Sequence, residues 1–201
     1  MAEKKLGQIS VTEYLELEGQ SDVKNEYDNG AIVSMSGGTL NHGIIGNNIN
    51  TCLNNAIRSK GMGCMAINGD VRIFITNANS FVYPDAMVIC GPIETFEADE
   101  NSVVNPVLIV EVLSKSTESY DRGDKFHKYC SLPSFREYIL IDQYKPVIDV
   151  LYREKAGYWK MATYIGMEKS ISLNTIHSEI SLEDIYRNAQ GLLQPQFRLE
   201  L

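Results

Sequence analysis

The segment Val107–Leu113 reads Val-Leu-Ile-Val-Glu-Val-Leu, so one carboxylate, that of Glu111, stands inside an otherwise apolar run. A run of this length is strand-sized, and apolar side chains at successive positions are typical of a central strand covered on both faces. Burying a carboxylate there costs several kcal/mol unless it is paired or binds a cation. The run therefore predicts a buried strand whose acidic residue needs a partner. The alternative is a strand-end carboxylate that is paired with a basic side chain or exposed at a sheet edge.

The rest of the chain supplies strands and helices around this run. Helical patterns cover Val11–Glu18, Asn41–Lys60, Ser116–Ser131 and Ser181–Arg187. A hairpin is predicted over Lys24–Ser36, because Asn29-Gly30 readily adopts the positive φ angles of a tight turn. Strand-like runs cover Cys64–Ile67, Asp70–Ile75, Ala86–Cys90, Arg136–Asp142, Val147–Arg153 and Trp159–Ile165, whereas Gly91–Asn105 is acidic and loop-like. This order predicts an α/β or α+β fold, with a mixed β-sheet flanked by helices and an N-terminal hairpin, in a single domain over residues 1–201.

Charge and cysteine usage limit the possible functions. Lys and Arg number 18 against 26 Asp and Glu, a net charge of -8. Proteins that coat nucleic acid non-specifically are normally basic, so composition does not support that class. The N-terminal Met-Ala-Glu-Lys-Lys lacks the apolar stretch of a signal peptide, and no run is long enough to span a membrane. We therefore expect a cytoplasmic protein without membrane partners, in which the dispersed Cys52, Cys64, Cys90 and Cys130 are reduced core thiols.

A second carboxylate precedes the apolar run Ala86–Cys90. Asp85 follows Tyr83-Pro84, and the interval to Glu111 leaves room for a strand, a loop and a return strand. An aspartate and a glutamate on neighbouring strands can face each other across ~5 Å. Two carboxylates held together repel, so they share a proton or take a divalent cation. Taken alone, Pro84-Asp85 is also compatible with an ordinary turn.

A basic residue follows on a predicted helix. Asp121, Lys125 and Tyr129 are spaced i, i+4, i+8 and so share one helix face. If that helix packs over the sheet, Lys125 brings an ammonium to the carboxylates, while Lys128 lies about 60° off that face. We expect Lys125→Ala to lower catalysis by orders of magnitude with folding nearly intact, and Lys115→Ala to do little. The alternative is a solvated face with a weak Asp121–Lys125 ion pair.

Together these residues carry a resemblance to a known family. The matching motifs, in chain order, are Tyr83-Pro84-Asp85, Asn105-Pro106-Val-Leu-Ile-Val-Glu111-Val-Leu-Ser114-Lys-Ser116-Thr117, Tyr120-Asp121-Arg122-Gly123-Asp124-Lys125-Phe126, Tyr129, Arg136-Glu137-Tyr138 and Ile141-Asp142. This set of motifs resembles the Uma-type restriction-endonuclease-like proteins of the PD-(D/E)xK nuclease superfamily. Glu26-Tyr27-Asp28-Asn29-Gly30 and His42 are similar to that family's N-terminal signature. The resemblance implies a restriction-endonuclease-like fold in which Asp85 and Glu111 bind Mg²⁺, with Mn²⁺ as a substitute, and in which Glu26 assists. The superfamily lysine belongs two residues after the glutamate, where this chain has Leu113, so the resemblance points to Lys125 as a migrated lysine.

Two further residues are candidates with ordinary alternatives. His42 opens the long helix and can contact a phosphate or assist proton transfer, or it is a capping or buried histidine. Asp70 can support the site, or it is a turn residue.

These observations give a leading hypothesis and alternatives from other classes. The leading one is a Mg²⁺-dependent endonuclease that hydrolyses phosphodiester bonds in DNA, although the sequence does not distinguish DNA from RNA. Its catalytic residues are Asp85, Glu111, Lys125, Glu26 and His42, with Asp121, Tyr129 and Asp70 in support. The runner-up is a non-catalytic module that binds nucleic acid or protein and retains the nuclease fold. A structural or toxin–antitoxin-like partner protein is a third possibility. We also expect a homodimer, because two-fold symmetry is the commonest assembly and places two sites on a duplex.

Overall fold

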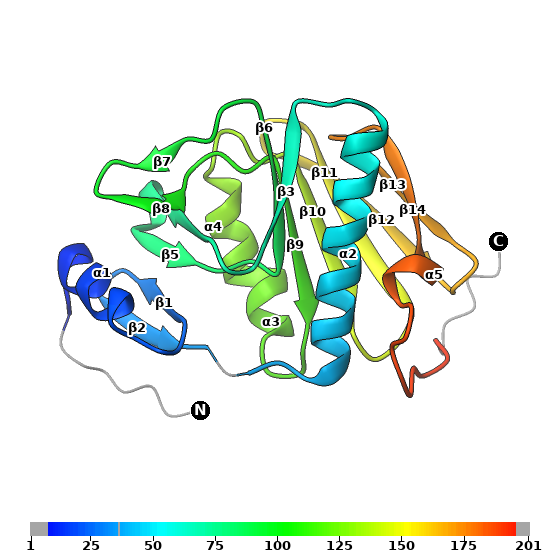
Figure 1. The fold of residues 1–201 in the computed structure, drawn as a ribbon, viewed down its shortest axis with the longest axis horizontal. Coiled ribbons are helices and arrows are strands. Elements are labelled where there is room, and N and C mark those ends of the chain that lie inside the picture. The colour runs from blue at the N-terminus through cyan, green and yellow to red at the C-terminus, as the bar shows by residue number, and fades with distance from the viewer. Residues whose placement is uncertain (1–7, 36, 196–201) are drawn as a thin grey trace.

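Strand β9 (Leu108–Leu113) is buried at every position, as the apolar run predicts. This computed structural model describes residues 8–35 and 37–195. β9 lies inside a six-stranded sheet of order β12-β11-β10-β9-β6-β3 (Figure 1). It runs parallel to β10 (Glu137–Asp142) and antiparallel to β6 (Ala86–Cys90). The other strands of this sheet are β3 (Cys64–Asn68), β11 (Val147–Lys155) and β12 (Tyr158–Ile165).

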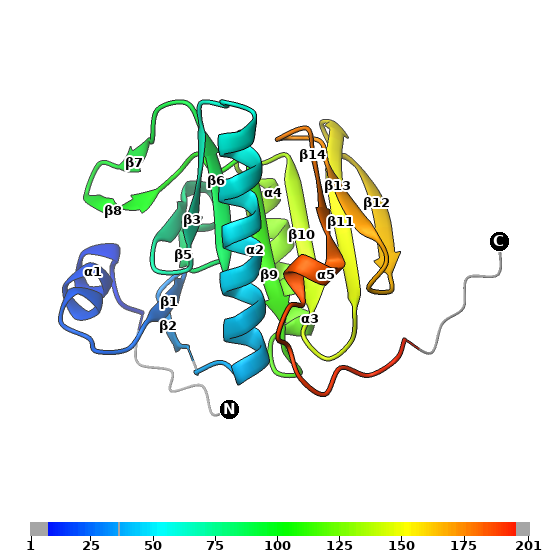
Figure 2. The same cartoon turned by 45° about the vertical axis from the view of Figure 1, so that its right-hand side comes forward.

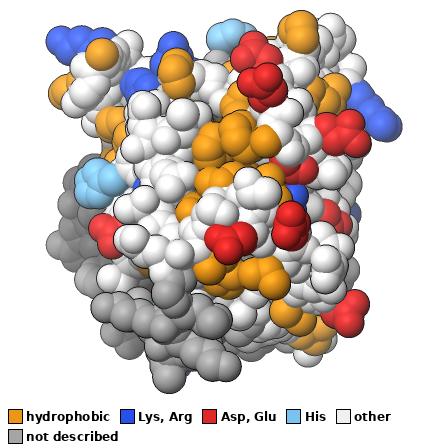
Figure 3. Space-filling view, turned by 90° about the vertical axis from the view of Figure 1, so that its left-hand side faces the viewer, with side chains coloured by type: hydrophobic (Ala, Val, Ile, Leu, Met, Phe, Trp, Pro, Cys, Tyr) orange, Lys and Arg blue, Asp and Glu red, His pale blue; other side chains and the backbone are white. Residues whose placement is uncertain are grey.

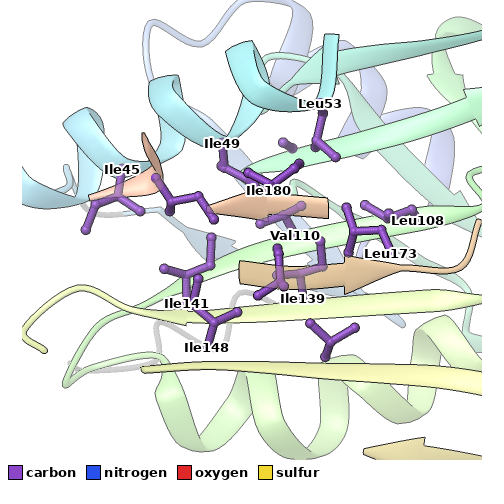
Figure 4. Packing of buried hydrophobic residues seen from close by; sticks show 14 of the residues in the cluster. Ile45, Ile49, Leu53, Leu108, Val110, Ile139, Ile141, Ile148, Leu173 and Ile180 are labelled. Carbon is purple, nitrogen blue, oxygen red and sulfur yellow. The ribbon is translucent and has the colours of Figure 1, made fainter. Parts of the chain in front are cut away.

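One face of this sheet is covered by helix α2 (Leu40–Ser59). Its buried stripe, Ile45, Ile49, Leu53 and Ile57, packs with Val110 of β9 in one hydrophobic cluster (Figure 4). The same layer contains the two-stranded ladder of β13 (Ser170–Leu173) and β14 (Ser178–Ser181) and the short helix α5 (Leu182–Ile185). Side chains alternate along a strand, so the even-numbered residues of β9 face this layer and the odd-numbered ones, including Glu111, face away from it.

The opposite face is covered by a helical segment of three parts. These are α3 (Glu118–Tyr120), the π-helical turn η2 (Asp121–Lys125) and α4 (Phe126–Cys130). Tyr129 of α4 packs in the cluster that contains Ile109 and Leu113 of β9. A helix was predicted over Ser116–Ser131, but the π-helical turn in its middle was not. The segment places one helix face above Glu111.

A second six-stranded sheet has the order β2-β1-β5-β4-β8-β7. Its strands are β1 (Asn25–Asp28), β2 (Ala31–Ser34), β4 (Arg72–Ile75), β5 (Ser80–Val82), β7 (Thr95–Phe96) and β8 (Asp99–Val103), and the 3-10 helix η1 (Thr76–Ala78) joins β4 to β5. The predicted hairpin is present, with φ angles of 44° at Asn29 and 100° at Gly30. Helix α1 (Val11–Gly19) packs Tyr14 against this sheet.

The predicted α+β fold class with a mixed sheet is confirmed, but three details differ. The hairpin belongs to a second sheet, because β1 pairs with β5. The segment Gly91–Asn105, predicted to be a loop, contains β7 and β8. β8 pairs with β4 and is held partly by an ion pair between Arg72 and Asp99. Strand propensity does not reveal such an ion pair. The ladder β13–β14 was not predicted. Ser36, the last residue of the predicted hairpin, lies outside the described residues.

The cysteine prediction is wrong for one pair. Cys64 of β3 and Cys90 of β6 are directly opposed on neighbouring antiparallel strands and form a disulfide. Cys52 and Cys130 are free and partly buried. The cysteines were expected to be reduced, as is typical of cytoplasmic proteins. Because two of them form a disulfide, the cysteines no longer support a cytoplasmic location.

One side of the molecule carries apolar side chains at its surface. The side bearing α1, β7 and β8 shows a strip of apolar side chains with Asp and Glu around it (Figure 3). Within the residues that the structure describes, no helix is long and apolar enough to cross a bilayer.

Candidate active site

Glu111 lies at the centre of the molecule, between β9 and the helical segment that covers it. Its side chain is 4% exposed. Oε1 accepts a hydrogen bond of 2.9 Å from the hydroxyl of Tyr129 and lies 2.9 Å from Nζ of Lys125. The partner that a buried carboxylate requires is therefore present.

Lys125 is surrounded by oxygen atoms. Besides Glu111, its Nζ lies 3.2 Å from Oε1 of Glu26 and 3.8 Å from Oδ1 of Asp121, and it donates to the backbone carbonyl of Tyr83 at 3.1 Å. The side chain is 5% exposed. The predicted proximity of Lys125 to Glu111 is present, and one ammonium is shared by three carboxylates.

Asp85 lies directly before β6, beside the strand that carries Glu111. Its N–H donates to the carbonyl of Val110 at 3.1 Å, and its Oδ2 accepts the N–H of Val112 at 2.6 Å. These bonds place the aspartate alongside Glu111, as the strand pairing predicts. Its Oδ2 also lies 3.4 Å from Nε2 of His42, in the first turn of α2. The side chains of Asp85 and His42 are 23% and 25% exposed, so the cluster opens to solvent at this end.

Glu26 reaches the cluster from the second sheet. It lies on β1, is 8% exposed, and accepts the backbone N–H of Tyr83 at Oε1 across 3.1 Å. The same oxygen contacts Lys125. Tyr83 thus binds Glu26 through its N–H and Lys125 through its carbonyl, while its hydroxyl bonds with Arg72 and Glu18.

The cluster is buried and has more negative than positive charge, and both features shift its pKa values. Burial raises the pKa of Glu111 well above its usual range; Lys125 opposes the rise, and Asp121 and Asp85 add to it. Burial acts to lower the pKa of Lys125, but the carboxylates of Glu111, Glu26 and Asp121 outweigh it and hold that pKa well above its usual range. A side-chain hydrogen bond to Asp85 raises the pKa of His42. Lys125 therefore stays protonated, and the surplus of carboxylates favours a further cation.

Three other basic or acidic candidates lie apart from this cluster. Lys128 pairs with Asp28 at 2.9 Å, so Lys125 is the lysine that contacts Glu111, as predicted. Asp70 is a correction: its carboxylate is 70% exposed and binds Lys24 at 2.6 Å, because it stands in the turn between β3 and β4. Lys115 lies over the ring of Tyr144, 5.5 Å from its centroid.

Sequence reasoning assigned no site role to two tyrosines that organise the cluster, although both stand in the motifs that carry the family resemblance. Tyr83 adjoins the Pro-Asp pair, and this adjacency is a signal that could have identified it. Tyr138 donates its hydroxyl to the carbonyl of Asp121 at 2.9 Å and is fully buried. Its position in an apolar strand gives no such signal, since a tyrosine there is also an ordinary core residue.

The carboxylates of Asp85 and Glu111 are chemically suitable ligands for a magnesium ion. Mg²⁺ prefers oxygen ligands and is commonly held by one or two carboxylates together with waters and substrate phosphates. Oδ2 of Asp85 and Oε1 of Glu111 already accept hydrogen bonds from the protein, and the second oxygen of each accepts none from the described residues. In the part of the chain that the structure describes, no three Asp, Glu, His or Cys side chains form a ready-made metal site. The two carboxylates therefore fit an ion that is completed by substrate.

Comparison with known proteins agrees with this architecture. The chain is 34% identical over 179 residues to "Uncharacterized protein slr1290" of Synechocystis sp., covering 89% of this chain and 92% of that protein. It is 30% identical over 166 residues to "Uncharacterized protein sll1609" of the same organism, covering 83% of this chain and 93% of that protein. A crystal structure described as a putative nuclease belonging to DUF820, from Anabaena variabilis, shares the fold, with a TM-score of 0.70, 17% identity, and coverage of 89% of this chain and 97% of that one. Residues 11–184 match the family model described as "Putative restriction endonuclease", and the chain therefore belongs to this family, Uma2.

Proposed function

We propose that the protein is a Mg²⁺-dependent endonuclease that hydrolyses phosphodiester bonds in DNA. One observation carries the proposal: Nζ of Lys125 lies 2.9 Å from Oε1 of Glu111. Glu111 lies on the strand that pairs with the one following Asp85. Lys125 thus supplies an ammonium group although Leu113 occupies the position, two residues after Glu111, where the superfamily has its lysine. Asp85 and Glu111 would hold the ion, with Mn²⁺ as a substitute. A divalent ion bound there polarises the phosphate and lowers the pKa of an attacking water.

The side chains of the protein have distinct roles in this proposal. The ammonium of Lys125 orients the attacking water and offsets charge that develops on the phosphate. Tyr129 fixes Glu111 by its hydrogen bond, and Glu26 and Asp121 hold Lys125 from two further sides. His42 lies at the solvent-facing end, where it can contact a phosphate or move a proton while it binds Asp85.

A second candidate function is a binding module that retains the fold without turnover. The presence of Leu113 two residues after Glu111 and the net charge of -8 favour it. Calorimetric titration with Mg²⁺ separates the two, because a module without a working site binds no ion that depends on both Asp85 and Glu111.

The central experiment is a cleavage assay on several substrates. Supercoiled plasmid, linear duplex, single-stranded DNA and RNA are each incubated with the protein in Mg²⁺, in Mn²⁺ and in EDTA. We expect cleavage of DNA only with a divalent ion, and its loss in Glu111→Gln and in Lys125→Gln. Lys115→Ala is the control that retains activity, because Lys115 contacts Tyr144 outside the cluster. Absence of metal-stimulated cleavage on every substrate contradicts the proposal and favours the binding module.

Two finer features belong to the same proposal. We place the protein in the cytoplasm, where its DNA substrate is found, and we assign it a homodimeric state. Fractionation tests the first, and sedimentation tests the second. A protein recovered outside the cytoplasm, or a monomer at micromolar concentration, contradicts the respective feature.

A further inference from the structure

The outermost strand of the central sheet, β12, has only one neighbour among the described strands. It pairs with β11 on one side and ends the sheet order on the other. In the turned view it forms the outer margin of the sheet (Figure 2). An exposed edge strand presents a row of unpaired N–H and C=O groups, which is a template for pairing with another chain.

β12 lacks most features that prevent such pairing. It is long for an edge strand, running from Tyr158 to Ile165, and contains no proline. Its irregularity with β11 is confined to the turn end, at Arg153 and Lys155. Met161 is 61% exposed and Tyr158 is 51% exposed. Two of the larger exposed apolar side chains of the described residues therefore stand on one free edge.

We propose that β12 pairs antiparallel with β12 of a second copy of this chain, centred on Ala162. The proposal rests on the homodimeric state proposed above, whose interface it specifies, and it does not depend on the cleavage chemistry. The two-fold axis that relates the two antiparallel strands runs perpendicular to the joined sheet. In an antiparallel pair, two residues that lie directly opposite each other point their side chains to the same face of the sheet. Side chains alternate between faces, so the axis must pass between a residue and its own copy.

Centring on Ala162 makes the edge complementary to itself in charge and shape. Ala162 then faces its own copy, Met161 faces the copy of Thr163, and Lys160 faces the copy of Tyr164, a cation with an aromatic ring. Lys160 is the one charged residue of β12. It is separated from its own copy by four residues along the strand and by one strand spacing across, which gives a distance of about 14 Å. Centring on Met161 would instead place the two lysines on a diagonal within about 8 Å. Met161 and Ala162 are the two centres that pair the longest stretch of β12, and charge selects Ala162 over Met161.

The symmetry has a consequence for the candidate active sites. The pairing joins two six-stranded sheets into one continuous sheet and reverses the strand direction across the axis. By the strand register, Glu111 is level with Thr163, one residue from the axis, so the two copies of the site lie at nearly the same level on one face of the joined sheet.

The test combines oligomeric state with a register-specific crosslink. Sedimentation of the wild type at micromolar concentration is expected to give twice the mass of one chain. Ala162→Lys, at an exposed position, brings two ammonium groups face to face and is expected to give a monomer with unchanged thermal stability. Ala31→Lys is the matched control, an exposed alanine of strand β2 in the other sheet, and is expected to remain dimeric.

Ala162→Cys fixes the register. Directly opposed residues have Cα separations of about 4.5–5.5 Å, within the range of a disulfide, so oxidation is expected to give a covalent dimer on a non-reducing gel. Lys160→Cys is the control that does not crosslink. A monomeric wild type, a dimer that survives Ala162→Lys, or a crosslink through Lys160→Cys and not through Ala162→Cys overturns the proposal. None of these outcomes depends on whether the protein cleaves DNA.

Discussion

The hydroxyl of Tyr138 donates a hydrogen bond to the backbone carbonyl of Asp121 across 2.9 Å. Tyr138 lies on β10, next to the strand of Glu111, and its ring stacks on Phe126 at the start of α4. Asp121 begins the π-helical turn that ends at Lys125. π-helical turns are rare and recur at functional sites. The sheet thus holds, through one hydroxyl, the turn that carries the buried ammonium.

Tyr138→Phe is expected to slow cleavage without unfolding the protein. The ring stays packed, and loss of one buried hydrogen bond lowers the free energy of unfolding by about 1 kcal/mol. The turn gains freedom to shift Lys125, so we expect kcat to fall by roughly tenfold or more. Urea unfolding and steady-state cleavage rates measure the two effects.

Tyr186→Phe is the matched control for that change. Tyr186 is 1% exposed, and its hydroxyl bonds with the carbonyl of Asp142 at 2.8 Å and with the backbone of Val147, so the variant loses buried hydroxyl bonds in the other hydrophobic cluster. We expect similar destabilisation with unchanged kcat. Equal losses of kcat in both variants would show that Tyr138 acts only on stability.

Removal of the buried ammonium is expected to affect both stability and activity. Lys125→Met leaves Glu111, Glu26 and Asp121 without their shared cation, and breaking a buried ion pair costs about 3–5 kcal/mol. The burial of Lys125 therefore corrects the sequence-based expectation that folding stays nearly intact. Cleavage is expected to fall by orders of magnitude even where the variant is fully folded, as checked by circular dichroism at low temperature.

Lys128→Met is the comparison for this variant. Its partner Asp28 is 48% exposed, and a pair of that kind contributes about 0–1 kcal/mol. We expect a small change in the free energy of unfolding and retained cleavage. Loss of cleavage in Lys128→Met with full activity in Lys125→Met would reverse the assignment of the lysine.

The sequence predicted those parts of the site that depend on local patterns. The apolar run around Glu111 gave a buried strand, and helical spacing placed Lys125 and Tyr129 on one face. The strand after Asp85 also pairs with that of Glu111 as expected, although the connection between them, residues 91–107, contains β7 and β8 of the second sheet.

The missed features depend on contacts between distant segments. β8 begins with Asp99-Glu100-Asn101, which are residues of low strand propensity, and Arg72 binds Asp99 only once the second sheet has formed. The disulfide requires the register that opposes Cys64 to Cys90, which no spacing in the sequence specifies. Tertiary pairing overrode local preference at each of these places.

Gly69→Ala is expected to displace the segment that carries Asp85. A Cβ atom at Gly69 would lie 2.8 Å from the carbonyl oxygen of Pro84 and 3.3 Å from that of Asp85, and both are backbone atoms. The segment must shift, so we expect lower Mg²⁺ affinity by calorimetry together with a loss of stability of about 1–3 kcal/mol. Gly63→Ala, where no atom lies within 4 Å, is the control, and an equal effect there would contradict this reasoning.

Asp99 is expected to make the protein sensitive to acid. Burial acts to raise its pKa, but hydrogen bonds from Ser102 and Arg72 and the charge of Arg72 outweigh it and hold the pKa below the ordinary value of 3.8. A lowered carboxyl pKa contributes stability that is present above the ordinary value and is lost as the pH falls through the folded-state value. Asp99→Asn should therefore lower stability at pH 7 and flatten its decline below about pH 4.

Urea unfolding at several pH values tests this expectation. Asp70→Asn is the control, because Lys24 also lowers the pKa of Asp70 but the pair is exposed to solvent. We expect its stability curve to follow that of the wild type. A wild-type curve that stays flat down to pH 3 would exclude Asp99 as a source of acid sensitivity.

The disulfide between Cys64 and Cys90 is expected to anchor the edge strand β3. Thiol titration of the denatured, unreduced protein should find the two thiols of Cys52 and Cys130, and reduction should raise the number to the four cysteines of the chain. The bond closes a segment with a sequence separation of 26 residues, so reduction is expected to lower the free energy of unfolding by about 3 kcal/mol.

Hydrogen exchange locates that effect within the fold. β3 pairs with β6 alone in the sheet order, so its amides should lose protection on reduction, whereas those of β10, between two strands, should keep theirs. The double variant Cys64→Ser/Cys90→Ser should behave as the reduced protein and should not respond to reductant. Four reactive thiols in the unreduced chain, or unchanged exchange of β3, would show that strand pairing alone holds this edge.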